Sequence, residues 1–252
     1  KLDRLGAPLL AETGELSSTE VARAIVRCLP AGVSSEPIDD YFGRIAGEEA
    51  GVLHLEAGSE ERSPFFCPGC PHNRSTELPS GSRALVGIGC HYMVQWMHRE
   101  SDHVSQMGGE GAAWIGQAPF TDEPHVFVNL GDGTYFHSGL LAIRAAVAAG
   151  VRITYKLLYN GSVAMTGGQP VDGDLDVPRL TRQLAAEGVR AIVVVAEEPQ
   201  RYGSGCGLAP GVRVEPRSRL QAVQRELREG EGVSVLVYDQ ACAAEKRRKR
   251  RR

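Results

Sequence analysis

Several features are missing from this sequence of 252 residues. It contains no apolar run that approaches the roughly 18 to 20 residues of a membrane-spanning helix, so we expect no membrane association. It begins with Lys1 and carries no secretory signal peptide, which predicts a cytoplasmic protein with reduced cysteines that is an internal piece of a longer chain. Ordinary fractions of hydrophobic (42%) and charged (23%) residues exclude a disordered or fibrous chain and allow one large or two modest domains.

Positive charge is scarce outside the last seven residues. Residues 246–252 are all Lys or Arg, so the formal net charge of −3 leaves −10 on the remainder of the chain. Because an acidic surface repels phosphates, we expect no nucleic-acid partner. The basic run 246–252 predicts a solvated linker into a following domain, with a nucleic-acid or docking role as the alternative.

Glycine is abundant, with 30 residues, and this excess indicates loops that approach a ligand closely. From Arg83 onward, short apolar runs alternate with helical stretches, which predicts an α/β domain over 63–245 with a doubly wound, mostly parallel sheet and helices on both faces. Before it, residues 1–62 predict a connector with one helix that begins at the capping box of Ser17 and Glu20. The expected strands are 84–88, 126–130, 151–158, 191–195 and 233–238, and the expected helices are 139–149 (ended by Gly150), 180–186 and 220–227.

Gly131-Asp132-Gly133 follows one predicted strand, and Asn160 follows the next after 26 intervening residues. If these strands are neighbours, Asp132 and Asn160 emerge at the same edge of the sheet, where open parallel sheets bind ligands. A carboxylate and an amide oxygen suit Mg²⁺. The glycines allow backbone N–H groups to approach a diphosphate, toward which a helix starting near Ser138 would direct its positive end. The alternative is a β-turn followed by a helix cap.

Six cysteines are present, and three of them form a pattern. Cys67-Pro68-Gly69-Cys70 is a C-x₂-C pair, and Cys90 follows after 19 further residues. Such a pair serves in redox exchange, in zinc binding or in iron–sulfur binding. Neighbouring prolines fit a redox pair poorly, and a zinc ribbon needs a second C-x₂-C that the sequence lacks. Three thiolates with a distant fourth favour a cubane cluster, and the candidates for the fourth are Cys28, Cys206 and Cys242.

From Phe65 to the C-terminus, the sequence resembles the thiamine-diphosphate part of the 2-oxoacid:ferredoxin oxidoreductases, in particular the large fused indolepyruvate ferredoxin oxidoreductases. The segments that carry the resemblance are FCPGCPHN, GIGCHYM, MGGEGAAWIGQAPF, NLGDGTYFHSG, AMTGGQP and YDQACAAEKRRKRRR. The resemblance implies a thiamine diphosphate-binding fold. It also implies oxidative decarboxylation of a 2-oxoacid, here an aryl-pyruvate such as indolepyruvate, with the acyl group passed to coenzyme A and electrons passed through a 4Fe-4S cluster to ferredoxin.

The resemblance also implies roles for individual residues. Asp132 and Asn160 would bind Mg²⁺ through their side chains and Ser162 through its main-chain carbonyl, although Tyr159 stands where many members have a second Asn. The implied 4Fe-4S ligands are Cys67, Cys70, Cys90 and Cys242, with Cys206 free. The residues implied to contact the cofactor are Gly89, Gly108, Gly109, Glu110, Gly131, Asp132, Gly133, Asn160, Thr166 and Gly167, and the histidines that could face substrate or cofactor are His91 and His137.

The same resemblance implies partners. A pyrimidine-binding domain elsewhere in the parent enzyme would supply the activating Glu, ferredoxin would accept electrons, and the enzyme would be a homo-oligomer. Two alternatives stay open. A non-oxidative thiamine diphosphate-dependent decarboxylase or carboligase would need Asp132 and Asn160 but not the cysteines, and a non-catalytic zinc-stabilised module would need only the cysteines.

Overall fold

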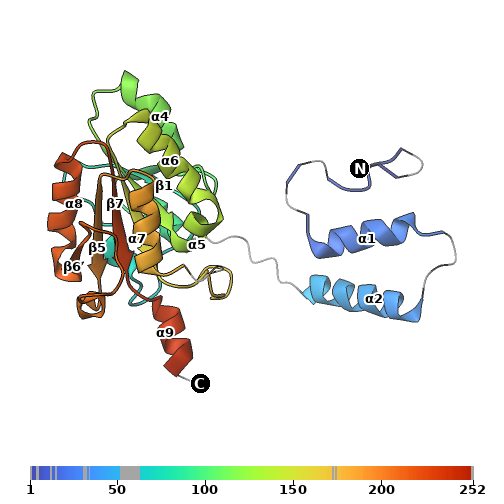
Figure 1. Cartoon of the computed structure of the whole chain (residues 1–252). Helices are drawn as coiled ribbons and strands as arrows, with labels where there is room; N and C mark the ends of the chain where they lie inside the picture. The colour runs from blue at the N-terminus through green and yellow to red at the C-terminus, as the bar shows by residue number, and fades with distance from the viewer. Residues whose placement is uncertain are drawn as a thin grey trace. The chain divides into compact units, whose positions relative to one another are not determined.

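The structure is a computed structural model that divides into two compact units, Lys1–Arg62 and Ser63–Arg252 (Figure 1). Each unit is described by itself. The residues that the structure describes are 2–3, 6–11, 13–14, 16–30, 33, 35–51, 63–171, 173 and 175–250.

The first unit contains two helices, α1 (Ser18–Cys28) and α2 (Glu36–Gly51). The predicted capping box is present at the start of α1. Glu20 N donates to Ser17 Oγ at 3.1 Å, and Ser17 N donates to Glu20 Oε2 at 2.7 Å. The prediction of a single helix was wrong, because α2 was missed. That helix contains Gly43 and Gly47, which lower helix propensity and obscure the apolar period.

The second unit contains a seven-stranded sheet, and all strand pairs that the structure describes are parallel. The strand order is β2-β1-β3-β4-β7-β5-β6. This arrangement confirms the predicted α/β fold. The strands are β1 (Ala84–Val86), β2 (Ser101–Val104), β3 (Val126–Gly131), β4 (Ile153–Tyr159), β5 (Ala191–Ala196), β6 (Arg213–Pro216) and β7 (Val233–Asp239).

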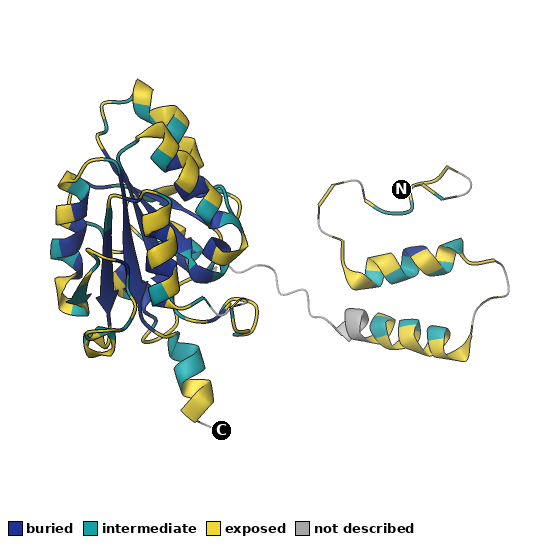
Figure 2. Ribbon diagram, in the orientation of Figure 1, coloured by how far each residue is buried: buried dark blue, intermediate teal, exposed yellow. Residues whose placement is uncertain are grey.

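Helices cover both faces of this sheet, and the strands between them are buried (Figures 1 and 2). On one face, Ile143 of α6 (Leu140–Ala149) and Leu180 of α7 (Val177–Ala186) join the main apolar core. On the other face, Leu220 and Val223 of α8 (Leu220–Glu229) pack in a second cluster. The helical elements are α3 (His72–Ser75), η1 (Cys90–Trp96), α4 (Ala112–Gln117), η2 (Ala118–Phe120), α5 (Asp132–Thr134), η3 (Tyr135–Gly139), α6 (Leu140–Ala149), α7 (Val177–Ala186), η5 (Pro199–Tyr202), η6 (Arg217–Arg219), α8 (Leu220–Glu229) and α9 (Ala243–Arg250). No helix among the described residues is both long enough and apolar enough to cross a membrane.

The central elements lie within a few residues of their predicted positions, and Gly150 ends α6 with the left-handed φ of 65° that suits a glycine cap. The edge strands β2 and β6 were missed, since their polar and charged residues lack an apolar pattern. The helix after the GDG motif also differs from the prediction. Helical backbone begins at Asp132 and not near Ser138, so the first turn starts at the motif itself.

The predicted solvated linker 246–252 is helical over residues 246–250 and exposed from residue 247 on, and three of its residues contact the body of the domain; residues 251 and 252 lie outside the described part. The linker prediction considered only the charge of this run, whereas the contacts come from backbone carbonyls and a carboxylate that lie far away in the sequence.

Candidate cofactor site

Two neighbouring strands bring the GDG motif and Asn160 together. Strands β3 and β4 pair in parallel, with Gly131 opposite Leu158, so Asp132 and Asn160 follow at the same edge. The carboxylate of Asp132 bridges the two strand ends. Its Oδ2 accepts hydrogen bonds from Asn160 N at 2.9 Å and Gly161 N at 2.8 Å, and its Oδ1 accepts one from Gly133 N at 2.9 Å. The strand pairing and these three hydrogen bonds therefore position the two loops relative to each other.

Asp132 is buried, and burial raises the pKa of its carboxyl group above the ordinary value although three backbone N–H donors favour the charged form. A carboxylate offers about four lone-pair positions, so three donors leave room for a cation. A cation bound there would favour the charged form of Asp132, because its positive charge replaces the stabilisation by water that burial removes. Asp132 thus fits the predicted role of a Mg²⁺ ligand.

Asn160 lies beside Asp132 with its side-chain oxygen engaged. Ser162 N donates to Asn160 Oδ1 at 2.9 Å, and Ser162 Oγ does so at 3.1 Å. A hard cation could take the position of the hydroxyl, which is free to rotate. The two side-chain oxygens of Asp132 and Asn160 and the carbonyl of Ser162 are the type of donor that Mg²⁺ prefers.

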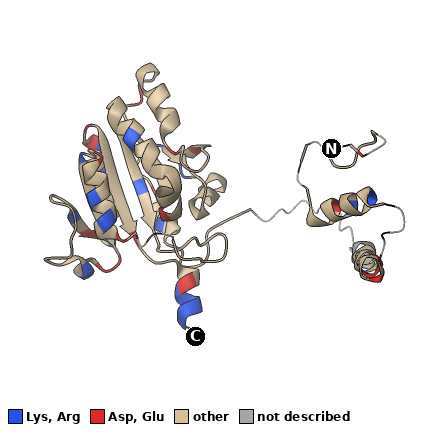
Figure 3. Cartoon of the chain, turned by 45° about the vertical axis from the view of Figure 1, so that its right-hand side comes forward, with Lys and Arg blue, Asp and Glu red and all other residues tan. Residues whose placement is uncertain are grey.

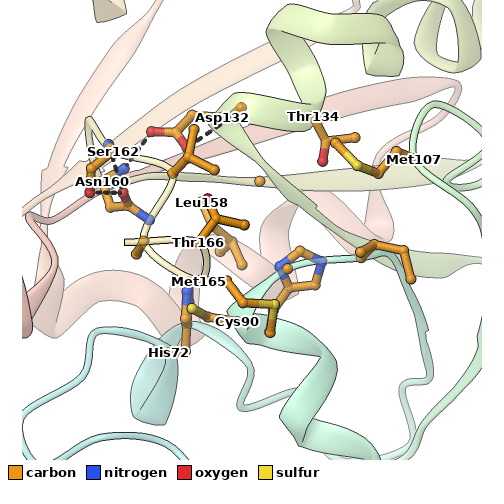
Figure 4. Close-up of a pocket in the computed structure, with 17 residues that line it drawn as sticks. His72, Cys90, Met107, Asp132, Thr134, Leu158, Asn160, Ser162, Met165 and Thr166 are labelled. Atoms are coloured by element: carbon orange, nitrogen blue, oxygen red, sulfur yellow. Dashed lines mark hydrogen bonds between the residues drawn. The ribbon is translucent and has the colours of Figure 1, made fainter. Parts of the chain in front are cut away.

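A cavity of about 200 Å³ opens next to these oxygens. Figure 4 shows Asp132, Asn160 and Ser162 on one side of it, and His72 and Cys90 on another. The lining residues are His72, Ile88, Gly89, Cys90, His91, Met107, Gly131, Asp132, Gly133, Thr134, Leu158, Asn160, Ser162, Val163, Ala164, Met165 and Thr166. Predicted cofactor residues from three separate segments therefore meet at one cavity.

Three other predicted cofactor residues, Gly108, Gly109 and Glu110, are not among the residues that line this cavity. Gly108 N donates to Glu110 Oε2 at 2.7 Å, and the second carboxylate oxygen of this buried residue has no hydrogen-bond partner among the described residues. Burial raises the pKa of Glu110. A Cβ on Gly87 would lie 2.6 Å from Glu110 Oε1, so only glycine fits at position 87. Gly109 lies next to Gln106 in the same turn.

The histidines divide into buried and exposed groups. His91 lines the cavity, burial lowers its pKa to about 3, and its Nε2 atom has no partner among the described residues. His72, which the sequence analysis missed, also lines the cavity, and burial lowers its pKa to about 4. Their ring centroids are 6.2 Å apart. His137 is exposed, contacts Ser138 Oγ at 2.7 Å and is not among the residues that line the cavity. The signal for His72 was its position two residues after Cys70.

Four of the six cysteines affect one another electrostatically. Burial raises the pKa of Cys70 to about 11, and charges on Cys90, Cys67 and Cys242 contribute to the rise. Burial also raises the pKa of Cys90, with contributions from Cys242 and Cys67. Neither effect involves Cys206. The CPGC loop also approaches the residue that follows Cys242, since a Cβ on Gly69 would lie 3.8 Å from Ala243 Cβ.

This grouping fits a cubane cluster better than a single metal ion. Within the described part of the chain, no three His, Cys, Asp or Glu side chains converge closely enough to hold one ion. A cubane binds each thiolate at a different iron, so its ligands stand further apart than those of one zinc ion. The raised thiol pKa values mean that binding must release protons.

Comparison with known proteins identifies the domain. Residues 87–238, more than half of the chain, match the family described as thiamine pyrophosphate enzyme, C-terminal TPP binding domain. The indolepyruvate oxidoreductase subunit IorA of Methanothermobacter marburgensis is 27% identical over 224 residues, covering 81% of this chain and 34% of that protein. The IorA subunit of Archaeoglobus fulgidus is 29% identical over 230 residues, covering 86% and 34%.

The chain therefore spans about a third of the length of these curated relatives. A solved structure of 2-oxoglutarate:ferredoxin oxidoreductase from Magnetococcus marinus matches with a TM-score of 0.53 and 20% identity, covering 73% of this chain and 66% of that one. This structural likeness shows a shared fold. Together the matches confirm the resemblance that the motifs indicated.

Proposed function

The chain belongs to the thiamine pyrophosphate enzymes as their C-terminal cofactor-binding domain, and we propose that it is the diphosphate-binding portion of a 2-oxoacid:ferredoxin oxidoreductase. The proposed reaction is oxidative decarboxylation of an aryl-pyruvate, namely indolepyruvate, to an acyl-CoA, with electrons passed through a 4Fe-4S cluster to ferredoxin. The names of the IorA relatives support this substrate. We further propose a cytoplasmic homo-oligomer in which another domain of the parent protein binds the pyrimidine ring.

One observation supports an oxidative reaction most directly. Cys90 lines the same cavity as Asp132 and Asn160, and its thiol belongs to the group of four that interact electrostatically. An electron acceptor held by these thiols would stand next to the cofactor. A decarboxylase that releases an aldehyde needs no acceptor there, so the cysteine group would lack a role in the non-oxidative alternative.

In this proposal, the chain's own residues bind and orient the cofactor. Asp132, Asn160 and the Ser162 carbonyl would hold Mg²⁺, and the N–H groups at the start of the helix after β3 would be donors for the diphosphate. Buried His72 and His91 stay neutral near pH 7, because their pKa values lie near 4 and 3, so each ring has one N–H donor and one acceptor. His72 Nδ1 contacts Ser75 Oγ at 3.4 Å, whereas His91 Nε2 has no partner among the described residues. Thiamine diphosphate, when bound, supplies the electron sink for decarboxylation.

Apolar side chains form much of the rim. Met107 and Met165 line the cavity although they are 45% and 48% exposed. A pyrimidine-binding domain seated here would cover them and exclude water from the reaction. The exposed His137 is proposed to act only from such an interface, since it lies outside the cavity lining. Gly108, Gly109, Glu110 and Gly167 are proposed to support the cofactor loops without direct contact.

Metal analysis and turnover test the proposal. Protein purified without oxygen should contain about four iron and four sulfide per chain. The full-length protein should then reduce ferredoxin when given indolepyruvate and coenzyme A, and more slowly when given pyruvate. Absence of iron and sulfide in protein that still binds thiamine diphosphate with Mg²⁺ would favour the non-oxidative enzyme. Bound zinc without thiamine diphosphate binding would favour the structural module.

A further inference from the structure

Helix α9 contacts both sides of the proposed cofactor site. Arg247 Nη1 donates to the carbonyl of Pro68, in the middle of the CPGC loop, at 2.9 Å. The next residue, Arg248, donates through Nη1 to the carbonyl of Gly167 at 2.7 Å. Gly167 follows Thr166, which lines the cavity. Adjacent residues of one helix therefore bind the cysteine loop and the loop after Asn160.

The backbone of both loops lies close to α9. Gly69 faces Ala243, with 3.8 Å between the position of a Cβ and Ala243 Cβ. Gly168 has φ +80°, and a Cβ there would lie 2.7 Å from Arg248 Nη1 and collide with Glu245. Glycine at position 168 is thus required both by its backbone conformation and by the approach of α9. These contacts show packing in addition to the two hydrogen bonds.

The sequence of α9 would form a weak helix without these contacts. Its last five described residues, 246–250, are all cationic, and like charges three or four positions apart destabilise a helix. Cations near a helix C-terminus gain from the macrodipole, but this gain is limited to the last turn. Figure 3 shows this positively charged end projecting from the domain. Contacts with the domain must therefore hold the helix in place, through Arg247, Arg248 and the ion pair of Lys246 with Glu197.

The position of α9 also determines where Cys242 lies. Cys242 directly precedes the helix, and its carbonyl accepts a hydrogen bond from Lys246 N at 2.9 Å. A helix held at Pro68 therefore keeps Cys242 at a constant distance from the loop that carries Cys67 and Cys70. A solvated linker would leave Cys242 free to move relative to the other three thiols.

We propose that α9 braces the two halves of the cofactor site, with Arg247 as a positioning residue for the CPGC loop and Arg248 as a positioning residue for the loop after Asn160. This inference rests on the proposed function, because it treats the cysteines as cluster ligands and the second loop as a cofactor loop. We therefore expect the two arginines to act separately, Arg247 on the CPGC loop and Arg248 on the loop after Asn160.

Single substitutions in the full-length protein test the roles of Arg247 and Arg248 separately. Arg247→Ala should speed the loss of iron to a chelator about fivefold, the ratio expected for one hydrogen bond of roughly 1 kcal/mol, and leave the Kd for thiamine diphosphate unchanged. Arg248→Ala should raise that Kd about fivefold in the presence of Mg²⁺ and leave iron loss unchanged. The matched control is Arg250→Ala, which removes a cation from the same helix that has no hydrogen bond or ion pair within the described residues.

A second measurement needs no cofactor. In protein without a cluster, the backbone amides of Cys67, Gly69 and Cys70 should exchange hydrogen faster in Arg247→Ala than in Arg250→Ala. Arg247→Gln keeps a donor without the charge and should behave like the wild type. If Gln behaves like Ala while Arg247→Lys behaves like the wild type, charge and not the hydrogen bond is responsible, and the positioning role is wrong.

The outcomes distinguish the brace from the function on which it rests. Wild-type protein without iron and sulfide would overturn the proposed cluster and, with it, the proposed role of Arg247. Wild-type protein with a full cluster, combined with equal iron loss and equal thiamine diphosphate affinity in all three alanine variants, would overturn the brace alone. Separate effects of Arg247 and Arg248, with a silent Arg250, would support it.

Discussion

The two halves of the cofactor site are built in different ways. The oxygen half consists of Asp132, Asn160 and Ser162, which follow two neighbouring strands and are joined by hydrogen bonds of 2.8 to 3.1 Å. The sulfur half consists of Cys67, Cys70, Cys90 and Cys242, which come from three distant segments. Among the described residues, the hydrogen bond that joins two of these cysteines is the backbone bond from Cys70 N to Cys67 O.

The two halves therefore differ in how far the protein alone positions their residues. The sheet positions the oxygen half, because the pairing of β3 and β4 places both strand ends at one edge regardless of any ion. The sulfur half depends on loop packing and on α9, and burial raises the pKa of the Cys70 and Cys90 thiols, so a metal that bound them would have to displace their protons. We therefore expect the oxygen half to be formed in advance and the sulfur half to be completed by the cluster.

The largest effect is expected from the residue that joins the sulfur half to α9. Cys242→Ser should abolish the cluster, because it removes one of four thiolates, whereas Cys206→Ser, the matched control, should keep the wild-type content. Iron and acid-labile sulfide per chain measure both. Full iron and sulfide in the Cys242→Ser protein would remove Cys242 from the ligand set and weaken the contrast between the two halves.

In the oxygen half, Asp132→Asn should raise the Kd for thiamine diphosphate with Mg²⁺ by more than about 100-fold, since loss of an outer-shell partner alone costs about 10- to 100-fold. Calorimetric titration measures this effect. Ser162→Ala is the control: it keeps the backbone hydrogen bond to Asn160 Oδ1 and removes only the hydroxyl. We expect its Kd to stay within about threefold of wild type, the range of one weak hydrogen bond. A weak effect of Asp132→Asn would show that it does not hold the cation.

The smallest effect concerns pH. Because burial raises the pKa of Asp132 in the ligand-free protein, its protonated form stabilises the folded state below the unfolded pKa, and this contribution is lost as pH rises through the folded pKa. Asn does not titrate. Urea unfolding without Mg²⁺ should therefore show wild type losing stability relative to Asp132→Asn as pH increases from about 4 to 7. The opposite trend would mean that the three N–H donors outweigh burial.

The central strands and the oxygen half were accessible to sequence reasoning. Apolar runs identified β3 and β4, and the residue types at their ends indicated a cation and a diphosphate. The edge strands β2 and β6 were not accessible, because a strand at an edge needs no continuous apolar pattern. Helix α2 was hidden by its glycines. The position of His72 near Cys70 was visible in the sequence, but no local rule places a histidine in a cavity formed by distant segments.

The sequence alone predicts the order of the central strands and helices, the C-x₂-C pair and the metal-binding residue types, because these depend on local propensity and apolar periodicity, which extend over only a few residues. The tertiary structure was needed to show which cysteines gather, which histidines are buried, and that three residues of the basic run after Cys242 contact the domain. Those outcomes depend on contacts between residues separated by many positions, such as Arg247 with Pro68, whose free energy no local pattern records.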